Sequence, residues 1–217
     1  MNQPGQSRHQ RTTVLQRSAP RAIEWTAEEI EQGGVVAIPT DTVYGLAASL
    51  SHPEAIDRIF ALKGRSVAKP IPILLASIDF LHIVSQNRDL KIMALLDEFW
   101  PGPLTLAIPS ETALPSGVTG ADGYVAIRVP NHPIAIEVIG KAGGAVACTS
   151  ANPSGQPPAR SAEEVATYFG ETVDVILDGG QTPGGAASTV AALRGGNLEI
   201  LREGPLSRSR LVSAWDN

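Results

Sequence analysis

The sequence of 217 residues contains one cysteine, Cys148, which excludes an internal disulfide and a cysteine-rich zinc site. It has no apolar run near the roughly 18 residues that span a bilayer. The N-terminus also lacks the apolar segment typical of a secretory signal. The net charge of -5 disfavours a protein that coats nucleic acid non-specifically. We therefore expect a cytoplasmic protein without a membrane segment.

Common catalytic and nucleotide-binding motifs are also missing. The four histidines, His9, His52, His82 and His132, come with no nucleophile elbow for a Ser-His-Asp triad. No His/Cys/Asp cluster has metal-site spacing, so we predict no protein metal site. The glycine-rich stretch 179–187 lacks the Gly-Lys-Ser/Thr ending of a P-loop. Chemistry would then depend on cations, hydroxyls and amides.

Strand-like and helix-like segments alternate early in the chain, and strands dominate late. Helices are expected to begin at Thr26 and Ser161, each in a capping box, and at Asn87. The remaining expected helices cover 53–62 and 133–141, and the expected strands cover 35–38, 71–75, 104–108, 124–129, 145–152, 173–177, 188–193 and 198–202. This order predicts an α/β fold with a twisted, mixed parallel and antiparallel sheet flanked by helices.

The two ends of the chain look different from its middle. Residues 1–21 contain four arginines and no acid, which predicts a disordered or loosely attached arm. Whether this arm only aids solubility or contacts RNA stays open. One folded domain is expected over 22–206, followed by a tail over 207–217.

The segment 61–70 reverses the sign of the overall charge. Lys63, Arg65 and Lys69 stand within seven positions without an acid, and Gly64 can end the preceding helix. Arginine offers a planar fork for phosphate oxygens, and lysine offers a point charge. The segment is either a phosphate site or a solvated basic turn at a helix end.

Polar side chains gather where predicted strands end. Thr42 follows one strand, and Ser150 and Asn152 end another. Arg128 shares a strand face with Tyr124, and is either a salt-bridged sheet residue or an anion receptor. Cys148 reads as a small core residue rather than a nucleophile. Together with the cationic segment, these residues would line one concave, basic face.

Six motifs in register closely resemble the YrdC-like family of threonylcarbamoyl-AMP synthases. The motifs are Pro39-Thr40-Asp41-Thr42-Val43-Tyr44-Gly45-Leu46, Lys63-Gly64-Arg65, Trp100-Pro101-Gly102-Pro103-Leu104-Thr105, Val125-Ala126-Ile127-Arg128-Val129-Pro130 with His132-Pro133, Thr149-Ser150-Ala151-Asn152-Pro153-Ser154-Gly155, and Ser188-Thr189-Val190. They cover roughly residues 23 to 205. The resemblance implies a single-domain, short-form enzyme that makes threonylcarbamoyl-AMP and pyrophosphate from L-threonine, bicarbonate or CO2, and ATP.

The resemblance also implies roles for individual residues. A catalytic set is expected at Lys63, Arg65, Ser150 and Asn152. These four are also expected to contact ATP, together with Lys69, Tyr124, Pro158 and Arg202. Threonine contacts are expected at Thr42, Leu74, Arg128, Cys148 and Ser188.

The resemblance further implies a place in tRNA modification. The product would feed the N6-threonylcarbamoyl modification of adenosine 37 in tRNAs that read ANN codons, through partner enzymes. Mg²⁺ is expected to arrive with ATP, held mostly by phosphates and water. The competing interpretation is a tRNA- or double-stranded-RNA-binding module without chemistry, and the overall acidity and scarcity of aromatic residues count against it.

Overall fold

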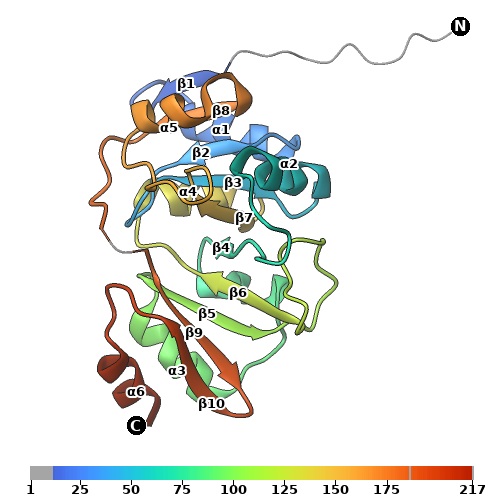
Figure 1. The fold of residues 1–217 in the computed structure, drawn as a ribbon, viewed down its shortest axis with the longest axis vertical. Coiled ribbons are helices and arrows are strands. Elements are labelled where there is room, and N and C mark those ends of the chain that lie inside the picture. The colour runs from blue at the N-terminus through green and yellow to red at the C-terminus, as the bar shows by residue number, and fades with distance from the viewer. Residues whose placement is uncertain (1–11, 186, 217) are drawn as a thin grey trace, which may run out of the picture.

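The computed structural model describes residues 12–185 and 187–216, and a mixed sheet of ten strands runs through it (Figure 1). The strand order is β1-β8-β2-β3-β7-β4-β6-β5-β9-β10, from the top of Figure 1 to the bottom. The strands are β1 (Thr13–Gln16), β2 (Val36–Ile38), β3 (Gly45–Ser49), β4 (Ile73–Leu75), β5 (Leu104–Pro109), β6 (Tyr124–Arg128), β7 (Ala145–Ser150), β8 (Val175–Asp178), β9 (Thr189–Arg194) and β10 (Asn197–Arg202). The sheet combines parallel pairs such as β4–β6 with antiparallel pairs such as β4–β7.

Within the described residues, six α-helices flank this sheet. They are α1 (Ala22–Glu31), α2 (Pro53–Lys63), α3 (Leu90–Phe99), α4 (Pro133–Lys141), α5 (Ala162–Phe169) and α6 (Arg208–Asp216). Short 3-10 helices cover Ile78–Ile83 and Gly170–Thr172. The expected α/β fold with a mixed sheet is confirmed, and all helices described in the structure are too short or too polar to cross a membrane.

Successive residues of the strands point to opposite faces of the sheet, and each face has its own apolar cluster. Val35 and Ala37 pack with the buried sides of α2 and α5. Val36 and Ile38 pack with α1 and α4. This period of two explains why these strands read as continuous apolar runs, because both faces of the upper sheet are covered.

The end of α2 is built as the sequence predicts. Gly64 adopts a left-handed conformation with φ of 56°, which glycine tolerates without a side-chain clash. The N–H of Gly64 donates to Ala61 O at 3.2 Å, and the N–H of Arg65 donates to Phe60 O at 3.0 Å. These bonds close the last turn and set the directions in which Lys63 and Arg65 leave the helix.

Two predicted helix starts are wrong. Helix α1 begins at Ala22, and the buried hydroxyl of Thr26 donates to the carbonyl of Ala22 at 2.8 Å instead of capping the helix. Helix α3 is capped by Asp89 rather than Asn87, since the Asp89 carboxylate accepts from the N–H of Lys91 at 2.9 Å. Side-chain hydrogen bonding alone does not distinguish a cap from a threonine that bonds one turn back within a helix. The start of α5 is confirmed by the Ser161 cap.

Part of the expected N-terminal arm is a strand. Residues 13–16 form β1, which pairs in parallel with β8 and buries Leu15. The expectation of a loose arm is therefore wrong for these residues, because the arginine-rich composition concealed a short edge strand that pairs with β8. Residues 1–11 lie outside the described part of the chain.

The expected C-terminal tail contains a packed helix. Leu211 and Trp215 lie one turn apart on α6 and are buried against the core that includes α3 and β10. The ammonium of Lys91 on α3 lies 4.4 Å from the centre of the Trp215 ring. The expectation of a tail missed this helix because only two of its described residues, four positions apart, are buried.

Replacing Leu211 with alanine should lower the free energy of unfolding by about 2–5 kcal/mol, because it removes a fully buried side chain. Urea unfolding followed by circular dichroism measures the change. Val212→Ala, at a 37% exposed position of the same helix, is the matched control and should change stability by about 0.5 kcal/mol at most. Equal effects of the two variants would show that α6 is not part of the cooperative fold.

Candidate anion-binding site

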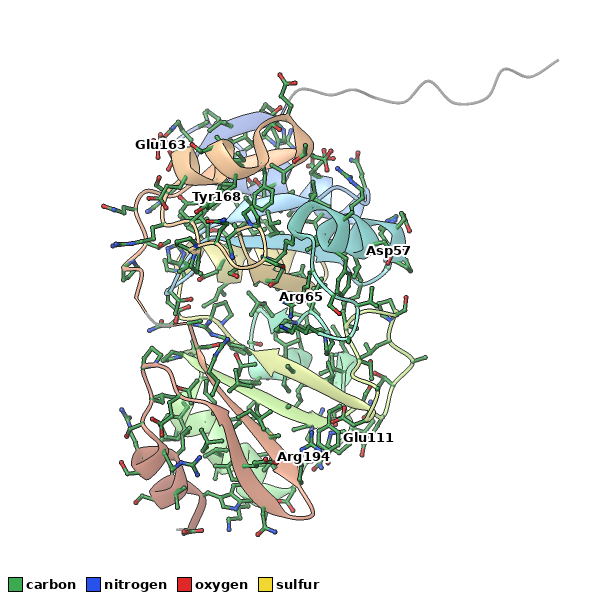
Figure 2. All side chains as sticks on the ribbon, viewed as in Figure 1. Asp57, Arg65, Glu111, Glu163, Tyr168 and Arg194 are labelled. Atoms are coloured by element: carbon green, nitrogen blue, oxygen red, sulfur yellow. The ribbon has the colours of Figure 1, made fainter. Side chains whose placement is uncertain are left out.

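Two cavities lie side by side at the centre of the sheet and share Arg65 and Ser150 in their walls. Figure 2 shows Arg65 at the middle of the molecule, below α2. The first cavity has a volume of about 180 Å³ and is lined by Thr40, Thr42, Val43, Tyr44, Gly45, Arg65, Pro72, Leu74, Thr105, Arg128, Cys148, Thr149, Ser150, Ala187, Ser188 and Arg202. The second, of about 360 Å³, is lined by Lys63, Gly64, Arg65, Ser66, Lys69, Ser150, Asn152, Ser154 and Gly155.

The register of the sheet places residues from neighbouring strands side by side in the wall of the first cavity. Leu74 on β4 pairs with Arg128 on β6, so these two side chains lie next to each other on one face. Cys148 on the neighbouring strand β7 lines the same cavity. All five residues implied as threonine contacts line this cavity: Thr42, Leu74, Arg128, Cys148 and Ser188.

Arg128 is held on two sides by the protein. Its Nη2 donates to both carboxylate oxygens of Asp41, each at 2.6 Å, and its Nε donates to the carbonyl of Gly102 at 2.9 Å. Burial lowers the pKa of the Arg128 guanidinium, and the Asp41 charge opposes this shift. Its Nη1 has only a 3.5 Å contact to the hydroxyl of Thr42. The salt-bridge interpretation is confirmed, and the remaining Nη1 keeps the anion-receptor hypothesis open.

Hydroxyl groups surround the guanidinium of Arg128. The hydroxyls of Thr40 and Thr42 lie 3.1 Å apart, and Thr40 donates to the carbonyl of Val43 at 2.6 Å. Across the cavity, the hydroxyls of Thr105 and Ser188 lie 2.8 Å apart. A small ligand with both a charged group and a hydroxyl would find partners for each in this cavity.

The thiol of Cys148 is buried and unsuited to nucleophilic attack. Burial raises its pKa to about 12, although the positive charges of Arg128 and Lys63 act in the opposite direction. A thiol attacks as the thiolate, which is scarce at neutral pH with such a pKa. A Cβ atom on Gly45 would lie 2.5 Å from the Cys148 sulfur. This close approach needs glycine and keeps the cavity open on that side.

Lys63 is buried at the wall of the second cavity. Its ammonium donates to the carbonyl of Ser150, to the carbonyl of Asn152 at 2.6 Å and to the Asn152 side-chain oxygen at 3.4 Å. Burial and the nearby charge of Arg65 lower the pKa of Lys63 to about 8. The lysine therefore carries a charge at neutral pH but holds its proton less firmly than a solvated lysine.

The other predicted phosphate contacts adjoin Lys63. Arg65 donates from Nε to the carbonyl of Lys69 at 2.7 Å and from Nη2 to the carbonyl of Pro70 at 2.9 Å. Ser150 donates to the side-chain oxygen of Asn152 at 2.6 Å, which keeps the turn after β7 compact. Lys63, Arg65, Lys69, Ser150 and Asn152 thus line one cavity, as the sequence leads us to expect.

Three predicted nucleotide contacts lie elsewhere. Arg202 lines the first cavity rather than the second, with its Nη2 donating to the carbonyl of Ser188 at 2.8 Å. Tyr124 begins β6, where its ring lies 5.0 Å from the guanidinium of Arg194, and it lines neither cavity. Pro158 is half-buried in the loop before α5 and also lines neither cavity.

Sequence reasoning missed three residues of the site. Asp41 pairs with Arg128, Thr105 bonds Ser188, and Tyr44 donates its buried hydroxyl to the carbonyl of Gly180 at 2.7 Å. The sequence could have pointed to Asp41, because it is the one acidic residue in an otherwise uncharged polar segment, 39–46. Thr105 and Tyr44 stand in two of the family motifs, but only the folded chain shows which partners they bond.

The charged side chains that line the two cavities are all cations. Lys63, Arg65, Lys69, Arg128 and Arg202 line them, and no aspartate or glutamate is among the described lining residues. Within residues 12–185 and 187–216, no three His, Cys, Asp or Glu side chains gather as metal ligands. The arrangement suits a ligand with several negative groups.

Asp41→Asn should lower the free energy of unfolding by about 3 kcal/mol or more, because it leaves the buried Arg128 guanidinium without its counter-charge. Asp122→Asn is the matched control, since its ion pair with Arg194 is exposed and should contribute less than about 1 kcal/mol. Urea unfolding at neutral pH measures both. Equal losses would mean that Asp41 does not hold a desolvated charge.

Known proteins resemble this chain over most of its length. The Sua5/YciO/YrdC family model, described as telomere recombination, matches residues 28–204. A protein of Pyrococcus abyssi named threonylcarbamoyl-AMP synthase is 38% identical over 198 residues, covering 89% of this chain and 58% of that protein. One of the same name from Halorhodospira halophila is 37% identical over 160 residues, covering 74% and 84% of the two chains.

Solved structures give the same result. The crystal structure of Pyrococcus abyssi Sua5 complexed with L-threonine superposes with a TM-score of 0.86 at 36% sequence identity. The match covers 94% of this chain and 60% of that one, so the present chain spans about three fifths of this relative. On the family match and these similarities, the chain belongs to the Sua5/YciO/YrdC family.

Proposed function

We propose that this protein synthesises threonylcarbamoyl-AMP from L-threonine, bicarbonate and ATP, and releases pyrophosphate. The observation that carries the proposal is the shared wall of the two cavities. One cavity gathers the five residues implied for threonine, the other gathers five implied for ATP, and Arg65 and Ser150 border both. Two substrates bound there would meet at that wall.

Threonine would bind in the first cavity. Its carboxylate would accept from the Nη1 of Arg128, the nitrogen that the protein leaves without a strong partner. The hydroxyls of Thr42 and Ser188 would pair with the threonine hydroxyl. Leu74 offers an apolar surface for the methyl group. Binding at both ends would orient the amine, which is the nucleophile.

ATP would bind with its phosphates in the second cavity. The amine of threonine, after capture of bicarbonate, becomes a carbamate whose oxygen attacks the α-phosphorus as pyrophosphate leaves. Lys63 and Arg65 would stabilise the charge that develops on the phosphate oxygens. Ser150 and Asn152 would hold the nucleotide and, through their carbonyls, already hold the ammonium of Lys63. No covalent protein intermediate is needed.

Mg²⁺ would enter as part of the ATP substrate. The residues lining the second cavity include hydroxyls and amides but no carboxylate among those described. Such a lining fits an ion held by phosphate oxygens and water rather than by a protein cage. In the cytoplasm, the product would pass to partner enzymes that modify adenosine 37 of ANN-decoding tRNAs.

The direct test is pyrophosphate release by the purified protein with ATP, Mg²⁺ and bicarbonate, with and without L-threonine. Release that depends on threonine, together with threonylcarbamoyl-AMP in the chromatogram, is the expected result. Serine in place of threonine controls for specificity. No release under any condition, with salt-sensitive tRNA binding, would replace this proposal with a non-catalytic RNA-binding function.

Lys63→Met and Arg65→Ala should each reduce turnover by at least about 100-fold, because each removes a charge that stabilises the transferring phosphate. Arg58→Gln is the matched control. It removes a cation from the same helix, at a half-exposed position that lines neither cavity. Thermal unfolding confirms that each variant is folded. Wild-type turnover in both cavity variants would contradict the site assignment.

ATP affinity should fall as pH rises through about 8, because Lys63 has its pKa lowered to about 8 and loses its charge there. An ordinary lysine would stay charged to about pH 10. Calorimetric titration from about pH 7.5 to 9, where ATP itself keeps its full charge, measures the effect. Lys63→Met should bind more weakly but without this fall. A parallel fall in the variant would assign the titration to another group.

A further inference from the structure

Three arginines of the first cavity, Arg65, Arg128 and Arg202, share one hydrogen-bonding pattern. In each, Nε and Nη2 donate to protein oxygens, while Nη1 has no protein partner closer than 3.5 Å among the described residues. The acceptors are the carbonyls of Lys69 and Pro70 for Arg65, the carbonyl of Gly102 and the Asp41 carboxylate for Arg128, and the carbonyl of Ser188 for Arg202. Each guanidinium is therefore held by the protein through Nε and Nη2, and its Nη1 can donate to a ligand.

Arg128 has a carboxylate that balances its charge, and among the described residues no ion pair balances the charge of Arg202. Arg128 has Asp41, whereas within the described part of the chain Arg202 donates to a neutral carbonyl, that of Ser188, at 3.2 Å from Nε and 2.8 Å from Nη2. Burial and the repulsion of Arg128 lower the pKa of Arg202. No carboxylate is among the described residues that line the cavity with them. An anion between the two guanidinium groups would relieve this repulsion.

Ser188 connects Arg202 to the threonine subsite. Its carbonyl holds the Arg202 guanidinium, and its hydroxyl pairs with Thr105 in the wall of the same cavity. A threonine bound to Arg128 and Ser188 would therefore have Arg202 as a neighbour. A threonine zwitterion would bring an ammonium among three cations, whereas a carbamate on the same nitrogen would bring a second negative group.

We propose that Arg202 binds the carboxylate that bicarbonate adds to the threonine amine. The first cavity would then hold N-carboxythreonine as a dianion, with one carboxylate on Arg128 and the other on Arg202. This inference rests on the proposed function and specifies the subsite for the bicarbonate-derived group. It differs from the nucleotide contact that the family resemblance implies for Arg202.

The carbamate step balances without any further reactant. The threonine ammonium and bicarbonate give the carbamate, one water and one proton, with a new C–N bond and the loss of one C–O bond. Arg202 stabilises the carbamate formed and shields its charge from the threonine carboxylate. Arg65, which borders both cavities, lies on the side from which ATP approaches. The free carbamate oxygen can then meet the α-phosphorus.

The test is the dependence of pyrophosphate release on bicarbonate, in degassed buffer with ATP and threonine saturating. Arg202→Gln should raise the KM for bicarbonate by about tenfold or more, the effect of losing a charged hydrogen bond. The KM for ATP should change by less than about threefold. Arg202→Lys keeps the positive charge but loses the planar guanidinium that can donate two parallel hydrogen bonds, so it should raise the KM for bicarbonate less than Arg202→Gln does. Arg208→Gln, an exposed cation paired with Glu203 outside both cavities, should match the wild type.

Other outcomes would overturn the inference in distinguishable ways. A rise in the KM for ATP with an unchanged KM for bicarbonate would assign Arg202 to the nucleotide and leave the proposed function intact. Unchanged kinetics in the variant would remove Arg202 from the site. A wild-type protein without threonine- and bicarbonate-dependent release would overturn the proposed function together with this subsite. If Arg202→Gln does not fold, the bicarbonate KM of Arg202→Lys decides, and no rise would reject the assignment.

Discussion

Both cavities depend on the hydrogen bonds that the buried ammonium of Lys63 donates. They tie the last turn of α2 to the turn that follows β7, through the carbonyls of Ser150 and Asn152. A charge removed from water needs such oxygen partners, so helix and turn cannot separate without leaving an ammonium buried and unpaired. The wall shared by the two cavities, with Arg65 and Ser150, stands beside this link. The same link places a cation of lowered pKa at the second cavity.

The arginines of the site are positioned largely by backbone carbonyls. These carbonyls lie in the segments that lead into β4, β5 and β9, and they hold a guanidinium without neutralising it. Arg128 is the exception, since Asp41 balances its charge. Arg128 thus has a counter-ion within the protein, whereas the charges of Arg65 and Arg202 are not neutralised by the carbonyls that hold them and attract an anionic ligand more strongly. A cavity of this kind is prepared for several negative groups before any substrate enters.

Much of the fold could be predicted from periodicity. The strands at Val36–Ile38 and Tyr124–Arg128 and the helix at Pro133–Lys141 have strong local patterns, and the structure confirms them. The errors came where the local signal was weak or ambiguous. Thr26 resembled a helix cap but lies within α1. The helix begins four residues earlier, at Ala22, which is buried in the apolar cluster on that face of the sheet. Strand β1 and helix α6 each expose most of their residues and bury few, so their packing partners, rather than their composition, decide that they form.

The sequence by itself determined the kinds of groups available to the site: cations at a helix end, an arginine on a strand, and hydroxyls and amides at strand ends. Local rules suffice for this, because helix stops and strand alternation depend on neighbouring residues alone. Only the tertiary structure decided which of these groups meet. The pairing of β4 with β6 put Leu74 beside Arg128, and the β9–β10 hairpin carried Arg202 to Ser188 in the first cavity rather than to the second. The Asp41–Arg128 pair spans 87 positions of the chain. Contacts of that length follow from strand order, which no local pattern encodes.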